Sequence, residues 1–315
     1  MWFDIGLIVS GILMLYGGGN VLITSSIRIA HRFKINPFVI GATIIAFGTS
    51  APELVVSIFA TLKDAPEVAL GNVIGSNIAN ICLVLGLTSL FGSITVSKET
   101  FQTETPPLLI ATVIIVFLAW DQKISRWEGI FLLLWMTGYL WLVFLKKENN
   151  EEIEELGKDK RLLENAGTWV QLALIVIGLI CLTIGANWLV KGAVNIARSF
   201  GISEWLIGIT IVALGTSLPE IFSTLIASFR GQHEMSLGNI YGSNIFNINL
   251  VIGTTSTIKP LQIATPIHTD LGILFFLTFL LAFLIRPKLK LVPAGGVLLL
   301  ICYILYITLK SLQVI

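Results

Sequence analysis

The chain of 315 residues is strongly apolar: 55% of its residues are hydrophobic, 12% are charged, and its mean hydropathy is +0.88. Because an ordinary soluble domain carries roughly 25% charged residues, this composition excludes a soluble globular protein and indicates a membrane protein with many spans. The net charge of +1, without a basic cluster among aromatic residues, gives no sign of nucleic-acid binding. The three cysteines all lie in apolar segments and are interpreted as small core residues.

Apolar windows of roughly 20 residues, long enough to cross a bilayer, divide the chain into ten predicted spans. They cover residues 5–27, 38–62, 69–92, 106–120, 127–145, 168–192, 205–228, 236–257, 270–286 and 292–309. The first begins without a basic region and is therefore interpreted as a retained span, not a signal peptide. The one long polar stretch, 148–167, is interpreted as a solvated linker. A regulatory cation site among its acidic residues has no recognisable ligand spacing.

An internal repeat organises the whole chain. Adding 167 to the residue number aligns the first half with the second without a gap from about residue 8 to residue 86. Residues 41–53 match 208–220 at 9 of 13 positions, and residues 69–80 match 236–247 at 8 of 12. Each half, 1–147 and 168–315, holds five spans, and an odd number makes the second half enter the membrane from the opposite side. We therefore expect an all-α membrane protein with ten transmembrane helices in two inverted-topology repeats of five, as in many secondary transporters.

The distribution of Lys and Arg predicts the orientation. With the N-terminus outside, 13 of the 20 Lys and Arg residues fall on the cytoplasmic side, as the positive-inside rule favours. We therefore expect a multi-pass protein of the cell membrane with its N-terminus outside and the linker in the cytoplasm.

One motif occurs once in each half, as Gly-Thr-Ser-Ala-Pro-Glu at 48–53 and Gly-Thr-Ser-Leu-Pro-Glu at 215–220. Proline breaks or kinks the helix that the apolar context predicts, and broken backbone inside a bilayer is tolerated only where it is buried in protein or lines a wet cavity. Of the 19 acidic residues, Glu53 and Glu220 are interpreted as the two in mid-span, where a charge costs at least about 2.5 kcal/mol. The repeat can bring these two carboxylates to one point, where a cation would relieve their repulsion. Two ionised carboxylates neutralise one Ca²⁺.

The residues around each glutamate can supply further oxygen ligands, of which Ca²⁺ takes about 6–8. Hydroxyls share the glutamate's helix face at i, i+3 and i+7 spacing. These sets are Ser50, Glu53 and Ser57 in the first half and Ser217, Glu220 and Thr224 in the second. The proline frees backbone carbonyls such as those of Ala46, Thr49, Ala213 and Thr216. We expect proline at the first helical position and glutamate at the second, where the helix N-terminus favours an ionised carboxylate. The alternative is a plain proline kink with a neutral, hydrogen-bonded glutamate.

A second motif, Gly-Asn-x-x-Gly-Ser-Asn-Ile-x-Asn, stands at 71–80 and 238–247. Its glycines, four residues apart, predict close helix approach. Oxygen-bearing side chains follow one another at intervals of four. They are Asn72, Ser76 and Asn80 in the first half and Asn239, Ser243 and Asn247 in the second. They suit Na⁺, Ca²⁺ or a coordinating water, while interhelical hydrogen bonding is the alternative, above all for Asn72, Asn77, Asn239 and Asn244.

The two motif pairs resemble the alpha repeats of the sodium/calcium exchanger family, within the calcium/cation antiporter superfamily, over essentially the whole chain. The resemblance implies ion sites between the second, third, seventh and eighth helices. Their implied ligands are the side chains of Glu53, Glu220, Ser50, Ser217, Ser76, Ser243, Asn80 and Asn247, with the carbonyls of Ala46, Thr49, Ala213 and Thr216. Where Asn247 stands, potassium-dependent relatives and some prokaryotic exchangers carry aspartate. Asparagine at this position resembles the potassium-independent exchangers, so the resemblance implies independence of K⁺.

These features predict an electrogenic antiporter in which Na⁺ entry drives Ca²⁺ out by alternating access, with no cofactor and as a monomer in the lipid bilayer. The long, glycine-bearing first and sixth spans are predicted to slide as a gating pair. A Ca²⁺/H⁺ antiporter is the main alternative, and a channel is disfavoured by the inverted repeat. An enzyme is not expected, because neither a His-Glu-x-x-His nor a Gly-x-Ser-x-Gly motif is present.

Overall fold

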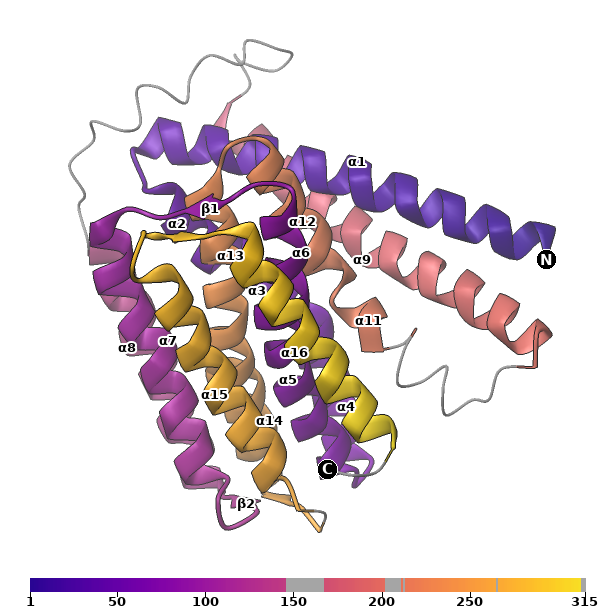
Figure 1. The fold of residues 1–315 in the computed structure, drawn as a ribbon, viewed down its shortest axis with the longest axis vertical. Helices are drawn as coiled ribbons and strands as arrows, with labels where there is room; N and C mark the ends of the chain where they lie inside the picture. Colours follow the sequence, from indigo (N-terminus) through magenta and orange to yellow (C-terminus); the bar gives the residue numbers. More distant parts are fainter. Residues whose placement is uncertain (146–166, 202–210, 212, 265, 313–315) are drawn as a thin grey trace. The chain divides into compact units, whose positions relative to one another are not determined.

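The computed structural model describes residues 1–145, 167–201, 211, 213–264 and 266–312 and consists almost entirely of helices (Figure 1). The chain forms two compact units, each built from both halves of the sequence. The first unit comprises Met1–Thr49 and Leu142–Asn239, and the second comprises Ser50–Trp141 and Ile240–Ile315. Residues 148–166 of the predicted linker and the first residues of the predicted span 205–228 lie outside the described residues.

In the first unit, two 32-residue helices accompany several short ones. Its elements are α1 (Trp2–Phe33), α2 (Pro37–Ile40), the π-helix η1 (Gly41–Ile45), α3 (Ala46–Thr49), α9 (Thr168–Ser199), α11 (Ala213–Thr216), α12 (Leu218–Phe229) and the beginning of α13 (His233–Phe246).

The second unit holds the remaining helices and four short strands. Its helices are α4 (Ala51–Leu62), α5 (Pro66–Ala79), the π-helix η2 (Asn80–Val84), α6 (Leu85–Leu90), α7 (Lys98–Leu118), most of α8 (Arg126–Leu145), the end of α13, the π-helix η5 (Asn247–Ile252), α14 (Gly253–Ile258), α15 (His268–Ile285) and α16 (Pro293–Ser311). Strand β1 (Ile94–Thr95) pairs antiparallel with β4 (Lys290–Leu291), and β2 (Lys123–Ile124) pairs with β3 (Leu261–Gln262). Each pair joins a loop of the first repeat to a loop of the second.

Seven described helices are long and apolar enough to cross a membrane. They are Trp2–Phe33, Pro66–Leu90, Lys98–Leu118, Arg126–Phe144, Thr168–Ser199, His268–Ile285 and Pro293–Ser311. A further span is the pair Pro37–Thr49 and Ala51–Leu62, bent by 42°. The apolar helix α12 covers the end of the seventh predicted span, 205–228, and the continuous run of α13, η5 and α14 covers the eighth, 236–257. That run is rich in asparagine and serine, which lowers its hydropathy. The ten-helix fold predicted from the sequence is confirmed.

The fourth predicted span begins earlier than expected. We placed its start at residue 106, but α7 begins at Lys98 and contains Pro106 and Pro107 in its interior. The Ser97 side chain explains the earlier start, because its hydroxyl accepts a hydrogen bond from the Thr100 backbone N–H at 3.1 Å and so caps the helix.

Helices α1 and α9 pack antiparallel with their backbones in close contact. A Cβ atom added to Gly11 would lie 2.6 Å from the Gly185 carbonyl oxygen, and one added to Gly185 would lie 2.8 Å from the Gly11 carbonyl oxygen. Similar approaches recur seven residues away, at Gly18 and Gly178. Small residues let membrane helices approach this closely, so the two longest helices of the first unit form one tightly packed pair.

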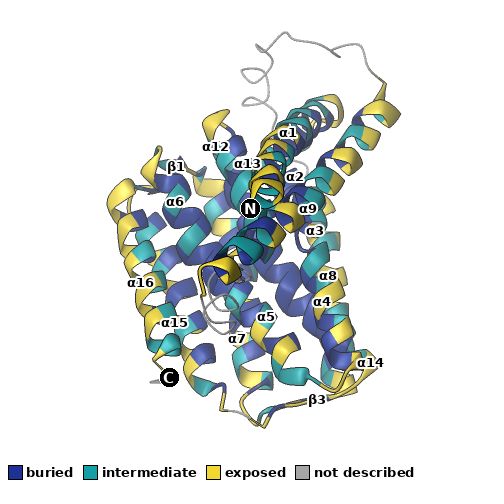
Figure 2. Ribbon diagram, turned by 90° about the vertical axis from the view of Figure 1, so that its right-hand side faces the viewer, coloured by how far each residue is buried: buried dark blue, intermediate teal, exposed yellow. Residues whose placement is uncertain are grey.

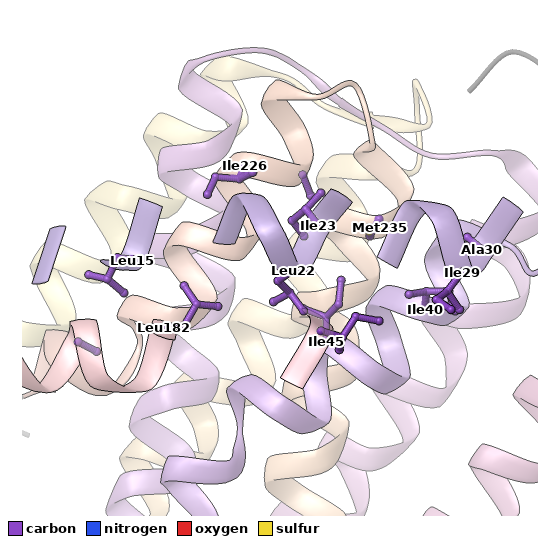
Figure 3. Packing of buried hydrophobic residues seen from close by; sticks show 13 residues of the cluster. Leu15, Leu22, Ile23, Ile29, Ala30, Ile40, Ile45, Leu182, Ile226 and Met235 are labelled. Atoms are coloured by element: carbon purple, nitrogen blue, oxygen red, sulfur yellow. The ribbon is translucent and has the colours of Figure 1, made fainter. Parts of the chain in front are cut away.

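The apolar core of the first unit lies beside this pair (Figure 3). Leu15 and Leu22 of α1 meet Leu182 of α9, while Ile226 of α12 and Met235 of α13 close the cluster. By contrast, large apolar side chains are exposed elsewhere, and exposed residues alternate with buried ones around α15 and α16 (Figure 2). Exposed residues such as Phe117, Trp141 and Phe283 are what a lipid-facing surface requires.

The glycine contact predicts a paired mutational effect. Gly185→Val should lower the melting temperature of the purified protein, because its side chain would overpack the α1 backbone at a cost of about 1–3 kcal/mol. Gly17→Val is the matched control, since a Cβ there has no described atom within 4 Å. Equal melting temperatures for the two variants would contradict this packing.

Candidate functional site

Each predicted proline break is present. Ser50 separates α3 from α4 with φ −84° and ψ 0°, and Ser217 separates α11 from α12 with φ −87° and ψ 0°. One detail of the prediction is wrong: Ala51 takes the first helical position, so Pro52 is second and Glu53 third. The proline still falls where its missing N–H costs no helical hydrogen bond, and the glutamate remains in the first turn.

Both glutamates are buried, each with 1% of its surface exposed. In the second unit, the Ser76 side chain hydrogen-bonds Glu53. The Glu53 Oε2 atom has no hydrogen-bond partner among the described residues. A buried carboxylate oxygen needs a counter-charge, a donor or a proton. Glu53 is therefore placed as a cation ligand would be.

Asn72 and Asn239 hold neighbouring helices together. Asn72 Nδ2 donates to Ser57 Oγ at 3.0 Å and to the Glu53 carbonyl at 3.3 Å, which ties α5 to α4. The equivalent Asn239 Nδ2 donates to Thr224 Oγ1 at 2.9 Å, which ties α13 to α12 in the first unit. These side chains carry out the interhelical hydrogen bonding that the sequence left as the alternative to ion ligation.

Four asparagines of the second unit form a symmetrical amide network. The Asn77 side chain donates to the Asn244 carbonyl at 3.2 Å, and the Asn244 side chain donates to the Asn77 carbonyl at 3.3 Å. Asn80 Nδ2 donates to Asn244 Oδ1, and Asn247 Nδ2 donates to Asn77 Oδ1, each at 3.0 Å. The sequence could show that Asn77 and Asn244 are equivalent, but not that they bond across the repeat.

This network fixes the direction of the two amides expected to bind ions. Because each Nδ2 of Asn80 and Asn247 is held by the network, each Oδ1 points away from it. Both Oδ1 atoms are buried and have no hydrogen-bond partner in the described part of the chain. Buried carbonyl oxygens of this kind suit a hard cation such as Na⁺ or Ca²⁺.

The two asparagines predicted as amide ligands also mark breaks in helical geometry. Asn80 is the first residue of η2, and Asn247 is the first residue of η5. A third π-helix, η1, directly precedes α3 and the first proline motif. Such π-helical turns concentrate at functional sites because their widened geometry displaces side chains and carbonyls from regular helical positions. Apolar periodicity gives no signal for them.

The serines that precede the prolines complete the pattern. Ser50 and Ser217 are 4% and 1% exposed, and their hydroxyls have no partner among the described residues. The predicted ligands divide between the two units. The second unit holds Ser50, Glu53, Ser76, Asn80, Ser243 and Asn247, and the first holds Ala46, Thr49, Ala213, Thr216, Ser217 and Glu220. That the two sets share one ion stays a prediction.

The ligand atoms are hard oxygens from carboxylates, amides, hydroxyls and carbonyls. Among the described residues, no group of three or more His, Cys, Asp or Glu could hold a metal ion. Such a ligand set favours Na⁺ or Ca²⁺ over transition metals. A duplicated, multi-pass helical protein with broken helices and buried oxygen ligands has the architecture of a secondary cation transporter.

Comparisons with known proteins agree with this class. The family model described as "Sodium/calcium exchanger protein" matches residues 3–145 and again residues 170–312, the second match displaced by 167 at both ends. The putative antiporter CaxA of Alkalimonas amylolytica is 39% identical over 253 residues, which cover 79% of each chain. The sodium/calcium exchanger MaX1 of Methanosarcina acetivorans is 28% identical over 292 residues, covering 81% of this chain and 83% of MaX1.

A solved structure is also similar. The sodium-calcium exchanger NCX_Mj, soaked with Na⁺ and Ca²⁺, matches with a TM-score of 0.83 at 33% identity, covering 97% of this chain and 98% of that one. The chain belongs to the sodium/calcium exchanger family. It is therefore a transporter and not an enzyme, and its two repeats are those of a cation antiporter.

The amide network predicts that a residue outside the ligand set controls ion affinity. Asn77→Ala should weaken Ca²⁺ binding about tenfold, because Asn247 loses the acceptor that fixes its amide. Isothermal titration calorimetry of the purified protein would measure the change. Asn195→Ala, which removes an amide bonded to Asp4 at 2.8 Å, is the control and should bind Ca²⁺ normally. Unchanged affinity in Asn77→Ala would contradict the role of the network.

Proposed function

We propose that the protein exchanges Na⁺ for Ca²⁺ across the cell membrane by alternating access. The observation that carries this proposal is the pair of buried, equivalent glutamates at equivalent helix breaks, each close in sequence to a serine hydroxyl that has no partner among the described residues. Membership of the exchanger family and the similarity to MaX1 and NCX_Mj support Na⁺ and Ca²⁺ as the ions.

The ligands are those expected from the sequence. Glu53 and Glu220 are the central ligands and share Ca²⁺, with the carbonyls of Thr49 and Thr216. The outer and inner Na⁺ sites use the remaining carbonyls and hydroxyls, and the two network-held amides line a middle site. These remaining ligands are Ala46, Ala213, Ser50, Ser217, Ser76, Ser243, Asn80 and Asn247. Na⁺ and Ca²⁺ compete for these overlapping ligands, which makes the transport an exchange.

Charge balance makes the exchange electrogenic and independent of K⁺. The two carboxylates neutralise one Ca²⁺ but leave excess positive charge when several Na⁺ bind, so dipoles must hold the surplus. Asn247 contributes a neutral amide and no third carboxylate. The transport cycle therefore moves net charge, and no K⁺ is needed to balance it.

Proton exchange is the second candidate. It is favoured by the burial of Glu53 and its Oε2 atom, which has no partner in the described residues, because protonation can satisfy a buried carboxylate without Na⁺. A Ca²⁺/H⁺ antiporter would use the same two glutamates as proton carriers.

Access to the ions changes through the long helices α1 and α9, which slide as a pair. Their glycine-mediated backbone contact supports movement as one body. The monomer is the functional form. Its N-terminus lies outside the cell and the linker 148–167 lies in the cytoplasm, so that Lys and Arg concentrate on the inner side.

Uptake of ⁴⁵Ca²⁺ into vesicles separates Na⁺ coupling from proton coupling. Vesicles loaded with Na⁺ should accumulate Ca²⁺, while a pH gradient without Na⁺ should not drive uptake. Glu53→Gln and Glu220→Gln should each reduce the initial rate at least about a hundredfold, because each removes a charge that Ca²⁺ requires. Wild-type activity in either variant would overturn the ligand assignment, and uptake driven by pH alone would favour the second candidate.

Membrane potential and K⁺ provide a further test of the same transport. A lumen-positive potential should accelerate Ca²⁺ uptake, because exchange of more than two Na⁺ for one Ca²⁺ carries positive charge out of the vesicle. Equal K⁺ on both sides, replacing choline, should leave the rate unchanged. A rate insensitive to potential, or one that rises with K⁺, would contradict electrogenic, potassium-independent exchange.

A further inference from the structure

The first unit contains a charged contact outside the ion ligands. Arg230 directly follows α12, and its guanidinium reaches α1. Nη1 donates to Thr24 Oγ1 at 2.5 Å, and Nη2 donates to Asn20 Oδ1 at 2.7 Å. We refer to these two hydrogen bonds as the Arg230 clasp.

Both acceptors are oriented for this contact by their own helix. The Thr24 hydroxyl donates to the Asn20 carbonyl at 2.6 Å, so its lone pairs accept from Arg230. Asn20 Nδ2 donates to the Tyr16 carbonyl at 2.9 Å, which turns Oδ1 toward Arg230. Because the acceptors lie four residues apart, they stand one above the other on one helix face, in reach of the planar guanidinium fork.

The clasp lies at the interface between α1 and α12, which is less extensive than the interface between α1 and α9. Helix α1 meets α9 through backbone contacts at successive glycines, but it meets α12 through side chains. A Cβ on Gly19 would lie 2.5 Å from Ile226 Cδ1, one residue from the clasp acceptor Asn20. Helix α1 therefore packs along α9 over a longer stretch than along α12, where buried side chains of the two helices meet.

The sequence of α1 makes the clasp specific for one register. Displacement by one helical turn, about 5.4 Å, would bring either Thr24 and Arg28 or Tyr16 and Asn20 beneath Arg230. The first arrangement opposes two guanidinium groups, and the second exchanges the threonine acceptor for a tyrosine. In the present register, both acceptors are already oriented by hydrogen bonds to the carbonyls of their own helix.

We propose that Arg230 is a positioning residue for ion exchange, whose clasp on Asn20 and Thr24 stabilises one of the two positions of α1 and so sets the balance between the two access states. The inference rests on the proposed function in one respect, namely that α1 moves relative to α12 during exchange. Arg230 touches no predicted ion ligand in this role and acts through the position of α1.

Transport kinetics from the two sides of the membrane test the proposal. Loss of the clasp lowers the population of the clasped state, so the apparent affinity falls on the side to which that state opens and rises on the other. In Arg230→Gln, the ratio of the two Michaelis constants for Ca²⁺, measured in right-side-out and everted vesicles, should change about three- to tenfold. A merely structural defect would reduce the maximal rate on both sides and leave the ratio unchanged.

Variants of the acceptors and of the charge sharpen this test. The double variant Asn20→Leu, Thr24→Val should change the ratio as Arg230→Gln does, and combining the two should add little, because each removes the same clasp. Arg230→Lys should bring the ratio of the two Michaelis constants part of the way back to the wild-type value, because the lysine can still donate to one acceptor. Arg286→Gln is the matched control, since it removes an exposed arginine at a helix end in the second unit. A ratio in Arg230→Gln equal to that of Arg286→Gln would overturn the proposal.

A distance measurement tests the clasp independently of transport. Spin labels at Leu13→Cys on α1 and Leu225→Cys on α12, with Cys82, Cys181 and Cys302 replaced by Ala, would report the distance distribution by double electron–electron resonance. Arg230→Gln and the acceptor double variant should each increase the population of a second distance, while Arg286→Gln should not. If the distance distribution in these variants were the same as in the wild type, the proposed role of the clasp would be wrong, even with normal exchange. If the wild-type protein showed no Na⁺-driven Ca²⁺ uptake, that result would refute the proposed function. It would leave the test of the clasp by distance measurement unaffected.

Discussion

The structure depends on one electrostatic constraint: a carboxylate buried within a membrane protein must be balanced. Glu53 and Glu220 are each 1% exposed, at a depth where an uncompensated charge is costly. The two glutamates occupy equivalent buried positions in the two repeats. Hydroxyl and amide side chains lie close to each of them. A carboxylate in such a place needs a proton, a hydrogen-bond donor or a counter-charge. In the proposed exchange, a transported cation supplies the counter-charge and is released when another cation replaces it.

The amide network of the second unit determines which atoms of its asparagines can face a ligand. An isolated asparagine can present either its oxygen or its nitrogen to an ion. Here the amide nitrogens of Asn80 and Asn247 are occupied by Asn244 and Asn77, so the oxygens remain directed elsewhere. The reciprocal bonds between Asn77 and Asn244 hold the two repeats in register at this point. The repeat therefore provides both the predicted amide ligands and the hydrogen bonds that orient them.

The sequence predicted the features that follow from local chemistry and duplication. The breaks at Ser50 and Ser217, the ten-helix fold and the family were all accessible, because proline in an apolar segment has few structural interpretations. The start of α7 at Lys98 was missed, because the Ser97 cap outweighed Pro106 and Pro107. The amide network and the π-helices could not be predicted, because they depend on which residues meet across the repeat and on hydrogen bonds displaced by a single residue.

Departures from the repeat matter for transport as much as the repeat itself. Two identical inverted halves would give inward- and outward-facing states of equal energy, so any preference must come from positions where the halves differ. The residues equivalent to the Arg230 clasp are Lys63, Asn187 and Lys191, so a second cation stands where Thr24 offers an acceptor. This set cannot form an equivalent clasp, because two ammonium groups repel each other. In the proposed exchange, the duplicated motifs supply equivalent ion ligands, while the unequal positions around α1 make the two access states differ in energy.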